Sequence, residues 1–361
     1  MKACVLIVGV GDAGSKIADA LARSGKVDRL VLTDQSQERG PTIAGMLASC
    51  YECSVDFNGL DATRQQDVEQ LLHAAKPDLV VQSASLLSPW AMIGRTDMVA
   101  TALGQAGLAV QLPAQLPILM TVMRAIRAID FQGPVANLSF PDVSHVILDR
   151  LGLAPTIGLG NVSMQHLRVR TALREQIIRD GGSSDEMPLI RLVGHHNQVY
   201  DVMKAQAPTN PDERCRVYLG KAGERADELA YQGFPMMPGV DYNIITAAAA
   251  LPVLLALLPG AESLRFSAPA PRGLPGGYPV VIEGGKVELD LPENAPLQDA
   301  VAFHWRIGRA DGVDSVADDG TVVFSEQAKQ AVRLIDPVLC EPLSPSDYLP
   351  RYQLLMRHLN S

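Results

Sequence analysis

The chain has 361 residues, of which 47% are hydrophobic and 20% are charged, so its composition is that of a globular protein long enough for two domains. A formal net charge of −9 argues against a nucleic-acid partner or an anionic membrane surface, because both require a basic face. Five scattered cysteines form no disulfide framework, which favours a reducing compartment, so we expect a cytoplasmic protein that acts on a small molecule.

The first part of the chain alternates short apolar runs with amphipathic segments, which is typical of a parallel sheet covered on both faces. We predict strands at 3–8, 29–33, 54–57, 79–82, 109–112 and 135–139. This alternation predicts a doubly wound α/β domain of the Rossmann type, which we assign to residues 1–150.

Beyond this domain the pattern changes, and residues 151–361 are predicted to form an α+β substrate domain. Its first element is a long helix over 161–180, which ends at two glycines. Further strands are expected at 189–193, 214–219 and 280–282, and further helices at 242–258 and 297–307. The stretch 268–279 is rich in Pro and Gly and is predicted to be a surface loop.

A glycine motif, Gly9-Val10-Gly11-Asp12-Ala13-Gly14, follows the first predicted strand and opens an amphipathic helix. The three glycines permit a tight turn, close approach of a pyrophosphate to bare backbone, and close packing of helix on strand. The helix N-terminus then faces the phosphates. The motif therefore predicts a dinucleotide-binding site.

Asp34 ends the second predicted strand, twenty residues past the last glycine of the motif. There its carboxylate can accept hydrogen bonds from the adenosine ribose hydroxyls. The same charge repels a 2′-phosphate, so we expect NAD in preference to NADP, although Arg39 would soften the repulsion if its loop folds back.

Residues after the next two strands should complete the nucleotide site, because the carboxyl ends of parallel strands meet at one edge of the sheet. Asp61 and Ala62 are expected to border the adenine. Ser83, Ala84 and Ser85 are expected to border the phosphates or the nicotinamide ribose.

Segments from residue 5 to about 290 resemble, in chain order, the lactate and malate dehydrogenase superfamily. Gly94-Arg95-Thr96-Asp97 resembles the segment with the family's mobile-loop arginine, so Arg95 would polarise the substrate carbonyl. Asn137-Leu138-Ser139-Phe140-Pro141-Asp142-Val143 resembles the family's Thr-Asn-Pro-x-Asp segment. Phe140 stands where the family has asparagine, and Ser139 is the nearest polar substitute at the cofactor.

Met164-Gln165-His166-Leu167-Arg168 resembles the family's helix with an aspartate and, three residues later, a carboxylate-binding arginine. Arg168 would thus hold a substrate carboxylate in a bidentate pair. Gln165 takes the place of the aspartate, and a neutral amide can orient a catalytic histidine but cannot stabilise its protonated form.

Val193-Gly194-His195-His196-Asn197 resembles the family's segment with the proton-transferring histidine, which would be His196 with His195 beside it. Neighbouring side chains of a strand point to opposite faces, so at most one of the two is expected to face the substrate. Thr246 and Asn161 would contact the substrate. The loop before Arg95 contains Pro89-Trp90, which suggests an apolar wall.

The resemblance implies an NAD-dependent oxidoreductase that transfers a hydride between nicotinamide and a small carboxylate-bearing substrate. This substrate would be a 2-oxo or 2-hydroxy acid or a related imine, with no metal ion, and the enzyme would form a homodimer or a homotetramer.

Three alternatives remain open. Residues 60–71 also resemble opine and saccharopine dehydrogenases, which reduce imines. Residues 194–197 partly resemble the NAD- and metal-dependent glycosidases, although the cysteine of that family is absent at 160–161. Gln165 and Phe140 also fit a dinucleotide-binding protein without catalytic activity.

Overall fold

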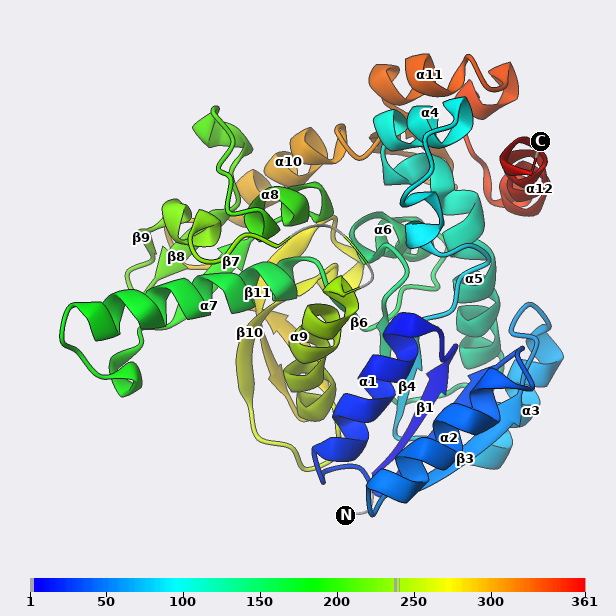
Figure 1. Cartoon of the computed structure of the whole chain (residues 1–361), viewed down its shortest axis with the longest axis horizontal. Helices are drawn as coiled ribbons and strands as arrows, with labels where there is room; N and C mark the ends of the chain where they lie inside the picture. Colours follow the sequence, from blue (N-terminus) through cyan, green and yellow to red (C-terminus); the bar gives the residue numbers. More distant parts are fainter. Residues whose placement is uncertain (1–2, 237–238, 240, 361) are drawn as a thin grey trace.

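A computed structural model describes residues 3–236, 239 and 241–360 of the chain (Figure 1). Its centre is a six-stranded parallel sheet in the order β3-β2-β1-β4-β5-β6. The strands are β1 (Cys4–Val8), β2 (Arg29–Asp34), β3 (Ser54–Gly59), β4 (Leu79–Gln82), β5 (Val135–Asn137) and β6 (Ile157–Gly158). The order reverses between β1 and β4, and doubly wound sheets bind their ligands at this point of the carboxyl edge. The predicted Rossmann-type α/β fold is confirmed.

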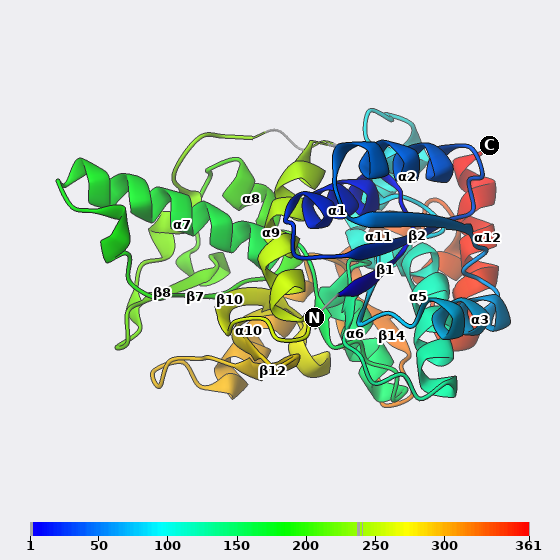
Figure 2. The same cartoon turned by 90° about the horizontal axis from the view of Figure 1, so that it is seen from below.

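Helices cover both faces of this sheet, as Figure 2 shows, with α1 and α2 on one face and α3 and α5 on the other. The helices of this part are α1 (Asp12–Arg23), α2 (Arg39–Cys50), α3 (Gln65–Ala75), α4 (Met98–Ala106), α5 (Leu112–Ala128) and α6 (Pro141–Arg150). Because both faces are covered, the inner strands β1 and β4 are almost wholly apolar and buried, whereas the edge strand β3 is polar and partly exposed.

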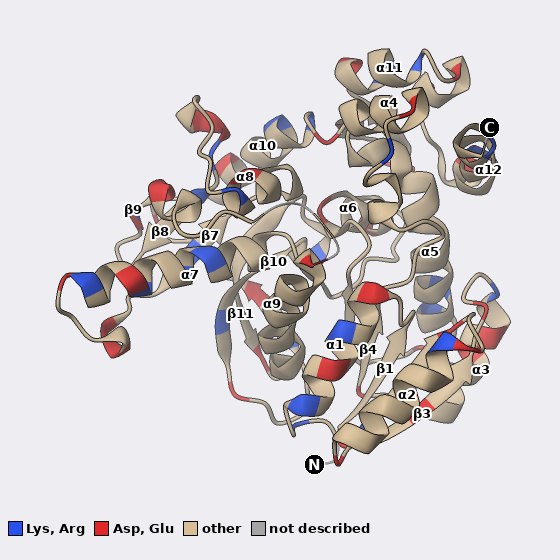
Figure 3. Cartoon of the chain, viewed as in Figure 1, with Lys and Arg blue, Asp and Glu red and all other residues tan. Residues whose placement is uncertain are grey.

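Helix α1 shows how the pattern of the sequence determines the packing. Ile17, Ala18 and Leu21 are buried against the sheet. Acidic and basic residues alternate along its outer face (Figure 3) and form ion pairs between Asp12 and Lys16 and between Asp19 and Arg23. Pairs at this spacing stabilise an exposed helix face modestly, and the buried face fixes the helix on β1.

The predicted strand at 109–112 is wrong. These residues form a 3-10 turn, Leu108–Gln111, which leads into α5, and the proline in the first turn of α5 suits a helix start. An apolar run buried on all sides does not distinguish a strand from a helix.

The segment Leu108–Ala128 is also the one described helix long and apolar enough to cross a membrane, and 89% of its apolar window is buried inside the protein.

The second half lies beside the sheet and contains two antiparallel sheets, β7-β8-β9 and β10-β11-β12 (Figure 1). Its strands are β7 (Ile190–Val193), β8 (Arg216–Leu219), β9 (Glu224–Arg225), β10 (Leu264–Pro269), β11 (Gly277–Glu283) and β12 (Lys286–Leu289). Its helices are α7 (Val162–Arg179), α8 (Val199–Met203), α9 (Tyr242–Ala256) and α10 (Leu297–Gly308). The apolar helix α9 packs between α1 and α7 and so joins the two halves.

The predicted surface loop at 268–279 is wrong as well. Strands β10 and β11 pair through Pro269 and Gly277, and most residues of the connection are buried. Gly273 and Gly276 have positive φ angles of 75° and 70°, which the tight turn requires. Proline and glycine here form a buried hairpin. A high content of proline and glycine is equally typical of an exposed loop, so composition alone does not separate the two.

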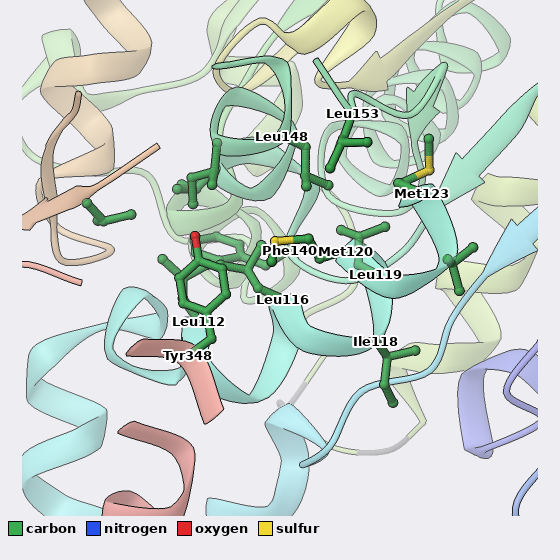
Figure 4. Packing of buried hydrophobic residues seen from close by; sticks show 14 of the residues in the cluster. Leu112, Leu116, Ile118, Leu119, Met120, Met123, Phe140, Leu148, Leu153 and Tyr348 are labelled. Carbon is green, nitrogen blue, oxygen red and sulfur yellow. The ribbon is translucent and has the colours of Figure 1, made fainter. Parts of the chain in front are cut away.

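The final segment returns to the Rossmann half. It comprises β13 (Val313–Val316), β14 (Val322–Phe324), α11 (Glu326–Val332) and α12 (Tyr348–Leu359). Helix α11 packs on α4 and α12 packs on α5. Figure 4 shows Tyr348 among the buried leucines of α5, in one cluster with Leu112 and Leu116. The division at residue 150 stays a prediction, but this segment shares the core of the first half.

Leu355→Ala tests whether α12 is part of that core. Leu355 is 1% exposed, so the substitution should lower the free energy of unfolding by about 2–5 kcal/mol, since it removes buried methyl groups and leaves a cavity. Leu349→Ala on the same helix is the control, because Leu349 is 50% exposed, and it should change stability by less than about 0.5 kcal/mol. Equal losses for the two variants in chemical denaturation would contradict this packing.

Candidate active site

A cavity of about 700 Å³ lies at the carboxyl edge of the central sheet. The loops after β1 to β5 form one part of its wall, and residues of α7, α8, α9 and α12 form the other. Every residue predicted to contact the cofactor lines it: Gly9, Gly11, Asp12, Ala13, Gly14, Asp34, Asp61, Ala62, Ser83, Ala84, Ser85 and Ser139.

The three glycines of the motif meet different surroundings. Gly9 has a φ of 87°, and a Cβ atom there would lie 2.7 Å from the Cβ of Ala84. A Cβ on Gly14 would overlap the carbonyl oxygen of Gly9 and lie 2.6 Å from the hydroxyl of Ser83. A Cβ on Gly11 would meet only the guanidinium of Arg39, at 3.6 Å. The fold itself therefore requires Gly9 and Gly14, whereas Gly11 presents bare backbone to the cavity.

Asp34 is held by backbone donors at the end of β2. Its Oδ2 accepts from the Val10 amide at 3.1 Å, and its Oδ1 accepts from the Ser36 amide at 2.9 Å. Arg39 does fold back: its Nη2 donates to the Val10 carbonyl at 3.0 Å and lies 3.5 Å from Oδ2 of Asp34. This end of the cavity therefore presents both a carboxylate for ribose hydroxyls and a nearby cation.

The serines after β4 and β5 are engaged with the backbone of this edge. The hydroxyl of Ser83 donates to the Gly9 carbonyl at 2.6 Å, and the hydroxyl of Ser139 donates to the Ala84 carbonyl at 3.0 Å. They connect the glycine motif, β4 and β5 into one rigid rim. Both serines thus shape the wall more than they offer free donors.

His196 begins the turn after β7 and lines the same cavity. Its Nδ1 lies 2.9 Å from Oδ2 and 3.0 Å from Oδ1 of Asp311, a residue 115 positions away in the loop after α10. Because Asp311 engages Nδ1, Nε2 is the nitrogen available to a ligand. A histidine oriented by a buried carboxylate is the arrangement that proton transfer requires.

The charges of this pair stabilise each other. Burial alone would lower the pKa of His196, but the charge and hydrogen bond of Asp311, together with the charge of Asp142, outweigh it, so the pKa is raised. Burial would raise the pKa of Asp311, but the charge of His196 and the hydrogen bonds from His195 and His196 hold it well below its usual range. Contact with Asp311 therefore favours the protonated imidazole of His196 and the ionised carboxylate of Asp311.

Asp142 and Phe140 fix His196 from the other side. Oδ1 of the fully buried Asp142 accepts from the His196 amide at 2.9 Å, and its Oδ2 accepts from the side-chain amide of Asn161. The ring of Phe140 packs edge-on against the imidazole, with centroids 5.1 Å apart. An apolar ring thus stands where the family that the sequence resembles has an amide. Asn161 and Thr246 both line the cavity.

Two residues assigned to the catalytic set lie behind the wall. The side-chain amide of Gln165 donates to the carbonyl of His195 at 2.9 Å, so Gln165 holds the backbone before His196 and does not touch its ring. The His195 ring also reaches Asp311, at 3.2 Å, but it does not line the cavity. Strand β7 ends at Val193, so the side chains of His195 and His196 do not have to point to opposite faces of a strand. Both of their rings lie near the carboxylate of Asp311.

The two arginines are not among the described wall residues either, so the structure does not bring them to the substrate, and their roles stay predictions. Arg168 lies one helical turn beyond the wall residue Met164, and its Nη2 donates to the Gln232 carbonyl at 3.1 Å. Arg95 pairs with Asp97 at 2.7 Å and donates to the carbonyl of Leu359 at 3.0 Å. The end of α12 thus holds Arg95 outside the cavity.

Aromatic residues form the wall around His196. Trp90 and Tyr242 contact edge to face with centroids 5.9 Å apart, and Tyr200 lies 6.2 Å from the His196 ring. Tyr352 of α12 also lines the cavity, and its hydroxyl donates to the Leu86 carbonyl at 3.1 Å. Pro89-Trp90 suggested an apolar wall from the sequence, whereas the tyrosines come from helices without a recognisable motif.

No family model matches the chain, and no curated protein does. Solved structures are similar over most of their length. The lactate dehydrogenase of Cryptosporidium parvum is 15% identical with a TM-score of 0.52, covering 86% of this chain and 98% of its own. The malate dehydrogenase of Picrophilus torridus is 14% identical with a TM-score of 0.51, covering 86% and 97%. The minor L-lactate dehydrogenase of Enterococcus mundtii is 16% identical with a TM-score of 0.51, covering 85% and 95%.

The chain therefore has the fold of the lactate and malate dehydrogenases, at an identity that indicates a divergent sequence. The predicted resemblance is confirmed at the level of the fold.

Proposed function

We propose that this chain is an NAD-dependent oxidoreductase in which His196 exchanges a proton with the carbonyl or imine group of a small substrate. One observation carries the proposal: the glycine motif and the His196–Asp311 pair lie in the walls of a single cavity. The similar fold of the lactate and malate dehydrogenases supports it. Arg168 and Arg95 lie outside the wall, so the carboxylate that the resemblance implies on the substrate is not part of the proposal.

The cavity fits a dinucleotide in volume and in chemistry. Its volume of about 700 Å³ is within the range of cofactor and ligand pockets. The backbone at Gly11 and the N-terminus of α1 would hold the pyrophosphate, and Asp34 would hold the adenosine ribose. The charge of Asp12 at this helix start is offset by Lys16 and by a 2.5 Å hydrogen bond from Asn243. A bound reduced nicotinamide supplies the hydride.

The residues of this chain would supply the proton. During reduction, the imidazolium of His196 donates from Nε2 to the substrate oxygen or nitrogen, while Asp311 stays ionised and holds Nδ1. In the reverse direction the neutral imidazole accepts that proton. Asp311 provides the negative charge that Gln165 cannot, so the glutamine in the family's aspartate position does not prevent proton transfer. Phe140 shields one side of the pair from water.

Asp34→Ser tests the cofactor preference. Removing the carboxylate abolishes the repulsion of a 2′-phosphate and leaves Arg39 beside the site, so the ratio of kcat/KM for NADPH to that for NADH should rise tenfold or more. Adding Arg39→Ala should reverse part of this rise, and Arg39→Ala alone should change NADH use by only a few-fold. An unchanged ratio in Asp34→Ser would contradict the assignment of Asp34 to the ribose.

Oxidation of NADH with a panel of carbonyl compounds, with and without primary amines, tests the function. Oxidation without an amine supports carbonyl reduction, whereas oxidation only with an amine supports the opine and saccharopine alternative. NADH that binds but is never oxidised would overturn the proposal in favour of a non-catalytic dinucleotide-binding protein. The glycosidase alternative finds no support in the described residues, where no group of His, Cys, Asp and Glu is suited to hold a metal ion.

A further inference from the structure

The charges in the cavity wall are unevenly placed. Asp12, Asp34 and Asp61 are its acidic residues among those described, and Arg39 is its one Lys or Arg. Arg39 lies 3.5 Å from Asp34, at the end expected for the adenosine. The positive charge of His196 is balanced by Asp311 at 2.9 Å. The His196 end therefore offers no uncompensated positive charge.

The two arginines that the resemblance places at the substrate make contacts of their own. Arg95 is bound to Asp97 and to the Leu359 carbonyl. Arg168 donates from Nη2 to the Gln232 carbonyl at 3.1 Å. Helix α12 holds the 86–95 loop at both ends, through Tyr352 on Leu86 and through Leu359 on Arg95. Bringing Arg95 to the substrate would break contacts that the folded chain already makes.

Aromatic rings occupy the place where a carboxylate would need donors. The rings of Phe140 and Tyr200 pack against His196 in the wall. Tyr242 extends this aromatic surface, because it contacts Tyr200 and Trp90. The hydroxyl of Thr246 is engaged, since it donates to the Tyr242 carbonyl at 3.0 Å. A carboxylate here would lose part of its hydration without gaining a Lys or Arg partner among the described wall residues, and it would lie near the negative charge of Asp311.

We infer that the substrate is an uncharged carbonyl compound with an apolar or aromatic substituent, and not a 2-oxo acid. This inference rests on the proposed function and specifies the substrate class of the same site. The aromatic wall binds the substituent by burying apolar surface, and His196 donates to the carbonyl oxygen. On reduction the carbonyl carbon gains the hydride, the oxygen gains the proton, and the product is a neutral secondary alcohol.

Matched substrate pairs test this inference with the whole chain and NADH. Pyruvate and butane-2,3-dione form one pair, and phenylglyoxylate and 1-phenylpropane-1,2-dione form the other, because each pair exchanges a carboxylate for an acetyl group of similar size. The diketone should have a kcat/KM at least tenfold above that of the acid in both pairs, and the phenyl diketone should be the better of the two diketones. Equal or reversed ratios would overturn the inference while leaving the proposed function intact.

Binding to the chain without turnover gives an independent readout. Thermal shifts with the same four compounds should show stabilisation by the phenyl diketone at concentrations where phenylglyoxylate has no effect, and the opposite order would overturn the inference. Failure of NADH itself to bind, or of every carbonyl to oxidise it, would be the failure of the proposed function, and the inference would fall with it.

Arg95→Leu and Arg168→Met test the two displaced arginines directly. Both variants should keep the wild-type ratio of diketone to acid within about threefold, because neither side chain lines the cavity. A loss of activity confined to the 2-oxo acids in either variant would show that this arginine reaches the substrate carboxylate, which would overturn the inference. A general loss shared by both substrates leaves the ratio unchanged and supports it.

Discussion

Replacing Asp311 by asparagine is expected to lower kcat for carbonyl reduction about a hundredfold or more and to shift its pH profile. The wild-type carboxylate accepts from Nδ1 of His196 and balances its positive charge. Asparagine keeps nearly the same size but cannot balance that charge, so the pKa of His196 should fall. The proton donor is then less populated at neutral pH. Asp311 acts through His196 and is thus a positioning residue.

The direction of the pH effect follows from the raised pKa of His196. Reduction requires the imidazolium, so wild-type kcat should persist above the ordinary histidine pKa of ~6.5 and decline only as pH passes through the raised value. In Asp311→Asn the decline should begin at lower pH. His196→Asn removes the proton donor, so its kcat should be lowered to a similar extent. The kcat of this variant should no longer decline as pH passes through the pKa of His196. Steady-state rates measured across pH would contradict the account if Asp311→Asn kept the wild-type profile.

The same pair should make stability depend on pH. A raised histidine pKa contributes stability that is complete below ~6.5 and is lost as pH rises through the folded value. A lowered aspartate pKa contributes stability that is complete above ~3.9 and is lost as pH falls through the folded value. The combined contribution should therefore be largest between those two pH values.

Gly11→Val is expected to remove NADH binding while leaving the fold intact. The protein leaves space at this position, where a Cβ would meet only Arg39 at 3.6 Å, and Gly11 has a φ of −59° that valine tolerates. The valine side chain would occupy the surface on which the pyrophosphate approaches the backbone. The Kd for NADH, measured by calorimetry, should rise at least tenfold, which is about 1.4 kcal/mol.

A matched control separates this effect from general damage. Gly45 lies in α2 with no neighbouring atom within 4 Å of a Cβ, so Gly45→Val should bind NADH as the wild type does. Gly11→Val should also keep the circular dichroism spectrum of the wild type. Unchanged NADH affinity in Gly11→Val would show that the glycine motif does not hold the dinucleotide.

The half of the site proposed to bind the nucleotide was predictable because its signals are local. The glycine motif, the following helix and Asp34 lie within one βαβ unit, so spacing along the chain translates directly into positions at the sheet edge. The prediction of a strand at 109–112 was wrong because a segment buried on all sides lacks the regular spacing of polar residues that would separate a strand from a helix. The strand that completes the sheet, β6, has only two residues and shows no pattern at all.

The half proposed for catalysis was predictable only in part, because its contacts join distant segments. His196 was found by resemblance, but its partner Asp311 lies 115 positions away in a short loop without a motif. The sequence shows that Gln165 cannot supply a negative charge, yet it does not show which other carboxylate does. Arg168 has the expected spacing on α7, but it donates to the Gln232 carbonyl and is not among the wall residues, which only the packed structure reveals.

A crystal structure of the NADH complex would show whether one dinucleotide spans the cavity from Asp34 to His196. We expect the adenosine ribose within hydrogen-bond distance of the Asp34 carboxylate, the pyrophosphate at Gly11, and the nicotinamide ring beside Nε2 of His196. A complex with the nicotinamide end bound away from His196, or with NADH outside this cavity, would contradict the account.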